Sequence, residues 1–239
     1  AASCSHTKEA GMNPAPDCTL CALGTLGRKW TVPGSGPIPA ALMVIGEAPG
    51  AEEDATAQPF VGVSGRLLRE ALRGVGIDPN TCYITNLVKC RPPGNRDPEW
   101  AELDTCTRHF LTAELTAVQP RVILAVGRYA LNYFFPGRLI SEVHGKPVWW
   151  HSTVVLPVYH PAAALYTPEV KALFLADVAG VQAAQNLAEY GNRAVTVRDG
   201  VAPPARLVAL DTEARLADGG LVALSTAISG EEAYVIHVS

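Results

Sequence analysis

Four short, largely apolar runs recur along the first two thirds of the chain, and each stops at a glycine or a polar residue. Runs of this length, rich in β-branched and aliphatic side chains, are typical of strands that are buried on both faces of a sheet. The four predicted strands are 40–45 (AALMVI), 83–88 (YITNLV), 122–126 (VILAV) and 154–158 (VVLPV).

Helical patterns lie between and after these strands. Apolar residues from 67 to 75 recur at intervals of three and four and stop near Gly76, which predicts an amphipathic helix. Asp97-Pro98 is typical of a helix start, and further helices are predicted over 128–135 and 168–190. Strands that alternate with helices predict an α/β fold with a central four-stranded parallel sheet flanked by helices.

The composition is that of a folded protein, since 48% of the 239 residues are hydrophobic and 18% are charged. No apolar run reaches the ~18–20 residues that cross a bilayer, and the first residues lack a basic-then-apolar signal segment. We therefore expect a soluble cytoplasmic monomer with no membrane partner. The net charge of −4 argues against a generic polyanion binder but leaves room for a local basic groove.

An acidic loop follows the first predicted strand. Residues 46–54 read GEAPGAEED and place four carboxylates just beyond the strand end. In open α/β sheets, ligands bind at the carboxyl ends of the strands, and Gly46 and Gly50 allow the backbone to approach a ligand closely. The alternative is an ordinary solvated acidic loop, and this stretch alone favours neither.

Six cysteines point to a metal or redox site, because an intracellular chain rarely carries structural disulfides. Cys18 and Cys21 form a two-ligand knuckle, Cys90 follows a strand end, and Cys106 lies on the next predicted helix. Zinc and an iron–sulfur cluster both suit this spacing. The remaining two cysteines are interpreted as structural.

Read together, four ordered motifs resemble the iron–sulfur, or family-four, uracil-DNA glycosylases over about residues 15–190. They are GEAPG at 46–50, PFVG at 59–62, YITNLVKCRPP at 83–93, and HPA at 160–162. The resemblance implies a [4Fe–4S] cluster on Cys18, Cys21, Cys90 and Cys106. It also implies hydrolysis of the N-glycosidic bond of deoxyuridine in DNA, releasing uracil and leaving an abasic site.

The same resemblance gives the motif residues their roles. Phe60 would stack on the uracil that has left the duplex, and Asn86 would read its edge through the amide. His160 would donate a hydrogen bond to uracil O2 as charge builds on the leaving base. Glu47 is the first candidate for stabilising the sugar cation and orienting water, and Glu53 is the second. The substrate would also contact Gly46, Ala48 and Gly50, with Ala48 standing where related families have an aspartate.

Contacts with the DNA backbone and grooves are expected from a set of basic residues and from one further loop. Lys89, Arg91, Arg96 and Arg128 are the candidate phosphate contacts. The loop that contains Pro161, Ala162 and Leu165 resembles the one that enters the minor groove, with Leu165 as a wedge. Residues 91–96 lack the histidine by which one related subgroup traps its product, so turnover is expected.

The last fifth of the chain has a different character. We divide the sequence into an N-terminal arm (1–17), a glycosylase domain (18–190), a linker (191–204) and a partial exonuclease-like segment (205–239). In that segment a strand at 206–210, a hairpin of 221–225 with 233–238, and the triplet DTE at 211–213 resemble the opening of the 3′–5′ exonuclease domain of family A DNA polymerases. We interpret it as a fragment or remnant without nuclease activity.

The leading hypothesis is thus a uracil-DNA glycosylase whose partner is uracil-containing DNA, joined to the remainder of a DNA polymerase chain, with a phage genome as one candidate source. A binding module that tethers a polymerase to such DNA is the alternative from another class. A zinc-stabilised nucleotide-binding domain with no role on DNA is the third.

Overall fold

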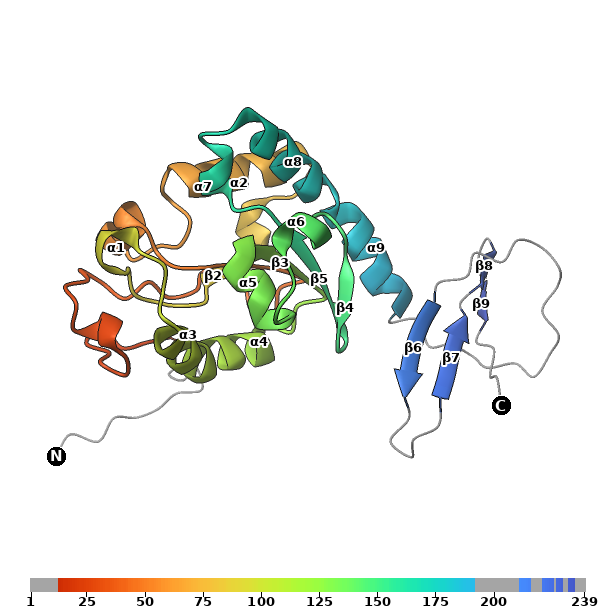
Figure 1. Ribbon diagram of the computed structural model, residues 1–239, viewed down its shortest axis with the longest axis horizontal. Helices are drawn as coiled ribbons and strands as arrows, with labels where there is room; N and C mark the ends of the chain where they lie inside the picture. The colour runs from red at the N-terminus through yellow and green to blue at the C-terminus, as the bar shows by residue number, and fades with distance from the viewer. Residues whose placement is uncertain (1–12, 192–210, 216–220, 226, 230–231, 235–239) are drawn as a thin grey trace. The chain divides into compact units, whose positions relative to one another are not determined.

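A computed structural model of the protein describes residues 13–191 and four short strands within 211–234 (Figure 1). The chain divides into two compact units, Ala1–Tyr190 and Gly191–Ser239. Within the described residues, no helix is both long and apolar enough to cross a membrane.

The first unit is built on one five-stranded sheet with the order β2-β1-β3-β5-β4. Its strands are β1 (Leu42–Gly46), β2 (Tyr83–Asn86), β3 (Val122–Val126), β4 (Val148–Trp150) and β5 (Thr153–Val158). The α/β fold and the four predicted parallel strands are confirmed. The predicted strand number was one too low, because β4 pairs antiparallel with β5 at the sheet edge. The three residues of β4 are apolar, but they follow a proline and form a run too short to be recognised as a strand from the sequence.

Both faces of the sheet are covered, which is why its strands read as continuous apolar runs. Alternate residues of β1 show this: Leu42 and Val44 belong to one core, and Met43 and Ile45 to the other. The first core lies under α2 (Val63–Gly74), α8 (Pro168–Ala179) and α9 (Val181–Gly191), and the second under α3 (Trp100–Cys106), α4 (Thr112–Val118) and α5 (Gly127–Phe134). The strands are thereby fixed, and the side chains at their carboxyl ends are fixed with them.

The predicted helices are present, but their bounds and number differ from the prediction. The helix predicted to start at Asp97-Pro98 begins at Trp100, with Glu99 as its N-cap. The short helices Ile140–Val143 and Pro161–Ala164 were not predicted. The helix bounds are α1 (Ala51–Thr56), α2 (Val63–Gly74), α3 (Trp100–Cys106), α4 (Thr112–Val118), α5 (Gly127–Phe134), α6 (Ile140–Val143), α7 (Pro161–Ala164), α8 (Pro168–Ala179) and α9 (Val181–Gly191). A π-helical turn, Thr107–Leu111, joins α3 to α4. The predicted helix over 168–190 is broken near Gly180. The prediction of an acidic loop over 46–54 was wrong in part, because residues 51–56 form α1. The first turn of this helix carries acidic side chains, which are favourable at a helix N-terminus.

The second unit is described only as two antiparallel pairs, β6 (Asp211–Arg215) with β7 (Leu221–Ser225) and β8 (Ala227–Ser229) with β9 (Glu232–Tyr234). The predicted strand at 221–225 is present, but its partner is β6 and not a later strand, so the predicted hairpin was wrong. The predicted strand at 206–210 and the end of the one at 233–238 lie outside the described residues.

Candidate active site

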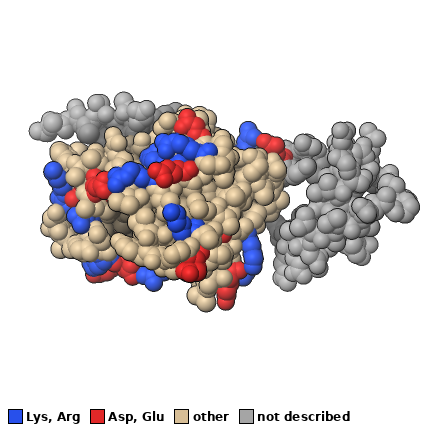
Figure 2. All heavy atoms as spheres, turned by 90° about the horizontal axis from the view of Figure 1, so that it is seen from above, with Lys and Arg blue, Asp and Glu red and all other residues tan. Residues whose placement is uncertain are grey.

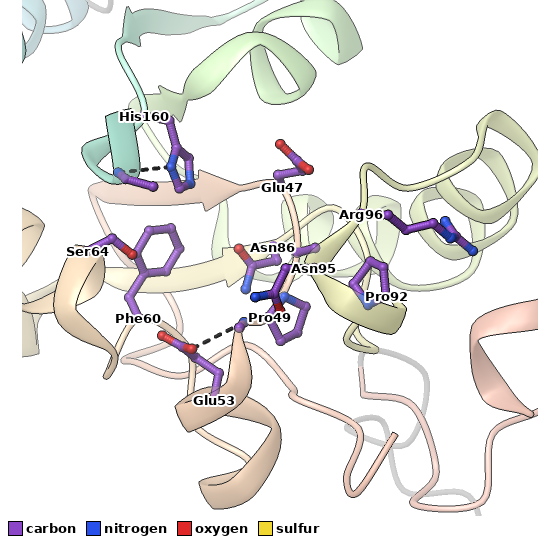
Figure 3. Close-up of a pocket in the computed structure, with 13 residues that line it drawn as sticks. Glu47, Pro49, Glu53, Phe60, Ser64, Asn86, Pro92, Asn95, Arg96 and His160 are labelled. Carbon is purple, nitrogen blue, oxygen red and sulfur yellow. Dashed lines mark hydrogen bonds between the residues drawn. The ribbon is translucent and has the colours of Figure 1, made fainter. Parts of the chain in front are cut away.

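A cavity of about 310 Å³ opens at the carboxyl edge of the sheet, where β1, β2 and β5 end (Figure 3). It collects most of the residues singled out in the sequence. Its walls are formed by Glu47, Ala48, Pro49, Gly50, Glu53, Phe60, Ser64, Asn86, Pro92, Asn95, Arg96, His160 and Ala162. Residues more than a hundred positions apart in the chain therefore meet in one pocket.

The inner end of the pocket is formed by Phe60 and Asn86, which pack over Gly46; Gly46 itself, predicted to contact the substrate, does not line the pocket. Gly46 and Asn86 are register partners at the ends of β1 and β2. A Cβ on Gly46 would lie 2.4 Å from Phe60 Cζ and 2.5 Å from Asn86 Oδ1, so the ring and the amide close over the glycine. Both side chains are almost fully buried. An aromatic face and an amide thus stand side by side, as Figure 3 shows.

Phe60 has an unusual backbone conformation with φ of 55°, and the loop around it is held from two sides. Glu53 Oε1 accepts hydrogen bonds from the N–H groups of Val61 (3.0 Å) and Gly62 (2.8 Å), while its Oε2 accepts one from Gly50 (3.1 Å). Arg69 donates to the carbonyls of Phe60 and Pro59 at 3.0 and 3.1 Å. A positive φ in a bulky residue is strained, and these contacts offset that strain.

His160 is the N-cap of α7 and has its hydrogen bonding set by the backbone. The N–H of Ala162 donates to His160 Nδ1 at 3.2 Å, so Nδ1 is an acceptor and the proton of a neutral ring lies on Nε2. Burial lowers the pKa of His160 to about 4, with the Glu53 carboxylate opposing the shift. At neutral pH the pocket therefore contains an uncharged imidazole that can donate from Nε2.

Glu47 lies in the loop between β1 and α1 and lines the same pocket. Burial raises the pKa of its carboxyl to about 7, with Asp97 adding to the rise and Arg128 opposing it. The loop is tied to the one after β2, because Leu87 N donates to Gly46 O (2.9 Å) and Val88 N donates to Glu47 O (3.1 Å). Sheet pairing thus continues past the strand ends and fixes Glu47 relative to Asn86.

Four pocket residues had no role in the sequence analysis: Ser64, Pro49, Pro92 and Asn95. Asn95 has φ of 56°, and its Oδ1 accepts a hydrogen bond from Arg91 Nε at 2.8 Å. The run Pro92-Pro93-Gly94-Asn95 is typical of a turn. Nothing local to these residues indicates that the turn reaches the pocket.

Lys89 was predicted to contact phosphate, and the structure contradicts this. Its side chain is fully buried and forms an ion pair with Glu114, whose side chain is equally buried, with Nζ to Oε2 at 2.6 Å. A buried ammonium cannot reach a DNA backbone. The partner lies on α4, 25 residues further along, so local sequence could not reveal the pairing.

The other predicted DNA contacts lie at or near the surface by the pocket. Arg96 lines the pocket, but its guanidinium makes a bidentate pair with Glu102 at 2.7 and 2.9 Å. Arg91 is partly exposed, and Leu165, just after α7, is 39% exposed. Ala162 lines the pocket while Pro161 is buried beside it. On the face drawn in Figure 2, basic and acidic side chains are interspersed over a largely uncharged surface.

The four cysteines assigned to a cluster meet at the second core: Cys90 and Cys106 are buried in it, and Cys18 and Cys21 are partly buried against it. None of the four forms a disulfide. Burial raises the pKa of Cys90 to about 12; Arg28 opposes this rise, and the thiols of Cys21 and Cys18 add to it. Burial likewise raises the pKa of Cys106 to about 12, with Lys89 opposing and Cys21 and Cys90 adding.

Cysteine thiols suit both of the metal sites that the sequence left open, zinc and an iron–sulfur cluster. Among the described residues, no group of three His, Cys, Asp or Glu side chains is placed to hold a metal ion.

The chain is similar to known proteins over the unit that contains this site. Residues 33–179 match the Uracil DNA glycosylase superfamily. The type-4 uracil-DNA glycosylase of Saccharolobus solfataricus is 41% identical over 177 residues, which is 70% of this chain and 81% of that protein. That of Thermotoga maritima is 42% identical over 166 residues, covering 67% and 85%. A DNA polymerase of Bacillus phage SP01 is 29% identical over 146 residues, 61% of this chain but only 16% of the polymerase.

Proposed function

The chain belongs to the type-4 family of the uracil-DNA glycosylase superfamily, and we propose that it hydrolyses the N-glycosidic bond of deoxyuridine in DNA. Uracil is released and an abasic site remains. One observation carries the proposal: Phe60, Asn86, His160 and Glu47 line a single pocket at the sheet edge. Because a glycosidic carbon is not accessible inside a duplex, the target nucleotide must leave the stack to enter it.

The inner end of the pocket selects the base. Uracil stacks on the ring of Phe60, and its N3–H donates to the Asn86 carbonyl while the Asn86 NH₂ donates to O4. Cytosine offers an acceptor at N3 and a donor at N4, so it meets this amide with like groups opposed. Leaving such buried groups unpaired costs about 1–3 kcal/mol each, which favours uracil.

His160 stabilises the leaving base. When the glycosidic bond breaks, its electron pair moves onto the uracil ring, and negative charge collects on O2. The Nε2–H of a neutral His160 donates to that oxygen, and the hydrogen bond from Ala162 N to Nδ1 keeps the proton on the correct nitrogen. A preorganised donor that meets charge formed only in the transition state typically contributes about 3–4 kcal/mol.

Glu47 acts on the sugar side. As a carboxylate it stabilises the oxocarbenium-like sugar and orients a water molecule, whose oxygen bonds to C1′ as its proton passes to the Glu47 carboxylate. The released uracil anion then takes a proton from solvent. Glu53 is a positioning residue, since its two oxygens already accept three backbone hydrogen bonds. Arg91, Ala162 and Leu165 contact the DNA that flanks the extruded nucleotide, whereas the buried Pro161 holds the start of α7.

The decisive experiment measures release of free uracil from single-stranded and duplex oligonucleotides with one deoxyuridine. The proposal predicts uracil and an alkali-labile abasic site, with thymine and cytosine oligonucleotides unchanged. A module that only tethers a polymerase would bind the uracil oligonucleotide without releasing the base. The presence of Glu47 and His160 in the pocket favours the enzyme.

The cofactor is proposed as a [4Fe–4S] cluster held by Cys18, Cys21, Cys90 and Cys106. When bound, it supplies a structural link between the N-terminal segment and the loop and helix that follow β2, not electron transfer. Iron and acid-labile sulfide content of the purified protein test this, and stoichiometric zinc would contradict it.

A link to a DNA polymerase is a second proposal, supported by the phage polymerase that shares this region. The DNA substrate also implies that the protein acts inside the cell. Mass spectrometry of the intact protein from its source cells tests the link, because a polymerase-linked chain would be far longer than 239 residues.

A further inference from the structure

A closed network of buried polar groups lies directly behind the base pocket, between β2 and α4. Its centre is the ion pair of Lys89 with Glu114. Glu114 Oε1 accepts from Tyr83 Oη at 3.1 Å and from Thr85 Oγ1 at 3.0 Å. In the part of the chain that the structure describes, no fully buried side-chain polar atom lacks a hydrogen bond. The network is therefore satisfied throughout.

The Lys89 ammonium connects this network to the pocket. Its three N–H bonds have three acceptors: Glu114 Oε2 (2.6 Å), Thr85 Oγ1 (2.5 Å) and the backbone carbonyl of Asn86 (2.9 Å). The last acceptor belongs to the residue whose amide enters the pocket. Lys89 is itself held through its backbone, since its N–H donates to Cys106 Sγ at 3.3 Å and its carbonyl accepts from Val32 N at 2.7 Å.

A buried ion pair is weak evidence for a role in stability. The desolvation penalty of its two charges can exceed their attraction, and well-packed apolar replacements are often equally stable or more so. The Asn86 side chain has little room to move, because its Oδ1 lies only 2.5 Å from the position that a Cβ on Gly46 would occupy. A fixed donor on the Asn86 carbonyl fixes the peptide plane from which that amide projects.

We infer that the buried Lys89–Glu114 pair is a positioning device for base recognition: through the Asn86 carbonyl, it orients the amide that distinguishes uracil from cytosine. The inference rests on the proposed function. Lys89 touches neither base nor sugar and acts only through Asn86.

The test compares three variants with the wild-type holoprotein. Lys89→Met with Glu114→Leu removes both charges together and leaves neither unpaired. Glu114→Gln keeps the ammonium and its hydrogen bond to Asn86. Val118→Ala, in the core one turn further along α4, is the control for lost packing on that helix. Melting temperatures identify which variants are folded at the assay temperature.

Two readouts are expected to respond in the double variant alone. Its single-turnover rate on deoxyuridine falls about 10–100-fold, as a misplaced contact typically causes, and its ratio of uracil to cytosine excision falls as well. The side-chain amide resonances of ¹⁵N-labelled Asn86, assigned by their loss in Asn86→Ala, shift or broaden. Glu114→Gln and Val118→Ala stay within a few-fold of the wild type on both readouts.

The inference is overturned if the folded double variant keeps the wild-type excision ratio and Asn86 resonances, or if Val118→Ala reproduces its loss of discrimination. The proposed function fails separately, when the wild-type protein releases no uracil. In that case the Asn86 resonances still decide whether the pair positions the amide.

Discussion

A methyl group on Gly46 would lie 2.4 Å from Cζ of Phe60, inside the van der Waals surface of the ring. Gly46 is part of a regular strand and has no positive φ, so space and not backbone conformation requires a glycine there. The last residue of β1 and the ring of the pocket thus define each other's positions.

Gly46→Ala is therefore expected to displace Phe60 and the Asn86 amide and to lower uracil excision at least about tenfold, as small misplacements at a reacting site do. Affinity for undamaged DNA should be unchanged. Gly74→Ala is the matched control, because a Cβ there meets nothing within 4 Å. Equal activity of the two variants would contradict the described packing.

Separate replacement of Glu47 and Glu53 by glutamine distinguishes the proposed catalytic role of Glu47 from the proposed positioning role of Glu53. Glu47→Gln should lower the single-turnover rate about 10²–10³-fold while DNA affinity stays within a few-fold, because its interaction forms mainly in the transition state. Glu53→Gln, which loses part of its hydrogen bonding to the Phe60 loop, should cost less in rate and should also weaken binding. Rapid-quench kinetics and fluorescence anisotropy measure the two quantities. A larger rate loss in Glu53→Gln would reverse the assignment.

The pH dependence should reflect Glu47 and not His160. With a pKa raised to about 7, Glu47 is protonated at lower pH, so the rate should fall about tenfold per unit below that value and level off above it. His160, with its pKa lowered to about 4, stays neutral over this range. The acidic limb should therefore persist in His160→Ala, at a much lower rate, and vanish in Glu47→Gln.

The same shift has a consequence for folding, which serves as an independent check. A carboxyl whose pKa is higher in the folded state favours the fold fully below its unfolded pKa of 4.5 and loses that contribution as pH rises through about 7. Glu47→Gln should accordingly raise the melting temperature at pH 8 and change it little at pH 4. A lower melting temperature at pH 8 would mean that the carboxylate is stabilised by contacts other than those described.

Asn86→Asp is expected to admit cytosine. A protonated or repositioned carboxyl can accept from the cytosine amino group, which the amide NH₂ opposes. Excision from cytosine-containing oligonucleotides should appear while uracil excision declines. Asn86→Ala controls for simple loss of the side chain, and strict uracil preference at a near-normal rate in Asn86→Asp would show that Asn86 does not read the base.

Replacing a cluster cysteine should bleach the protein and reduce its soluble yield, because cluster assembly contributes folding free energy. Cys90→Ala is compared with Cys82→Ala, since both thiols are buried but Cys82 belongs to the other core and is not a predicted cluster ligand. Iron content and the visible absorption band should be lost only in Cys90→Ala. A colourless, stable and active Cys90→Ala would remove the cluster from this site.

The parallel strands could be predicted from the sequence because each is buried on both faces. Such a strand is a continuous apolar run, which is visible in the local sequence without knowledge of its neighbours in the sheet. The sequence could also place Gly46, Asn86 and His160 at strand ends, where parallel topology brings them together. Short elements escaped it: α1 is stabilised largely by the acidic side chains of its first turn, and β4 by pairing with β5. Lys89 escaped it because burial of a charge depends on a partner on another element.

The hydrogen bonds from Leu87 to Gly46 and from Val88 to Glu47 restrict how this pocket can be redesigned. Because they tie the two loops residue by residue, inserting or deleting one residue in either loop would shift Glu47 by a full backbone step relative to Asn86. Side chains can be exchanged at Ala48 without altering that alignment, whereas loop length cannot be changed. Engineering of substrate range should therefore proceed by substitution on this side of the pocket.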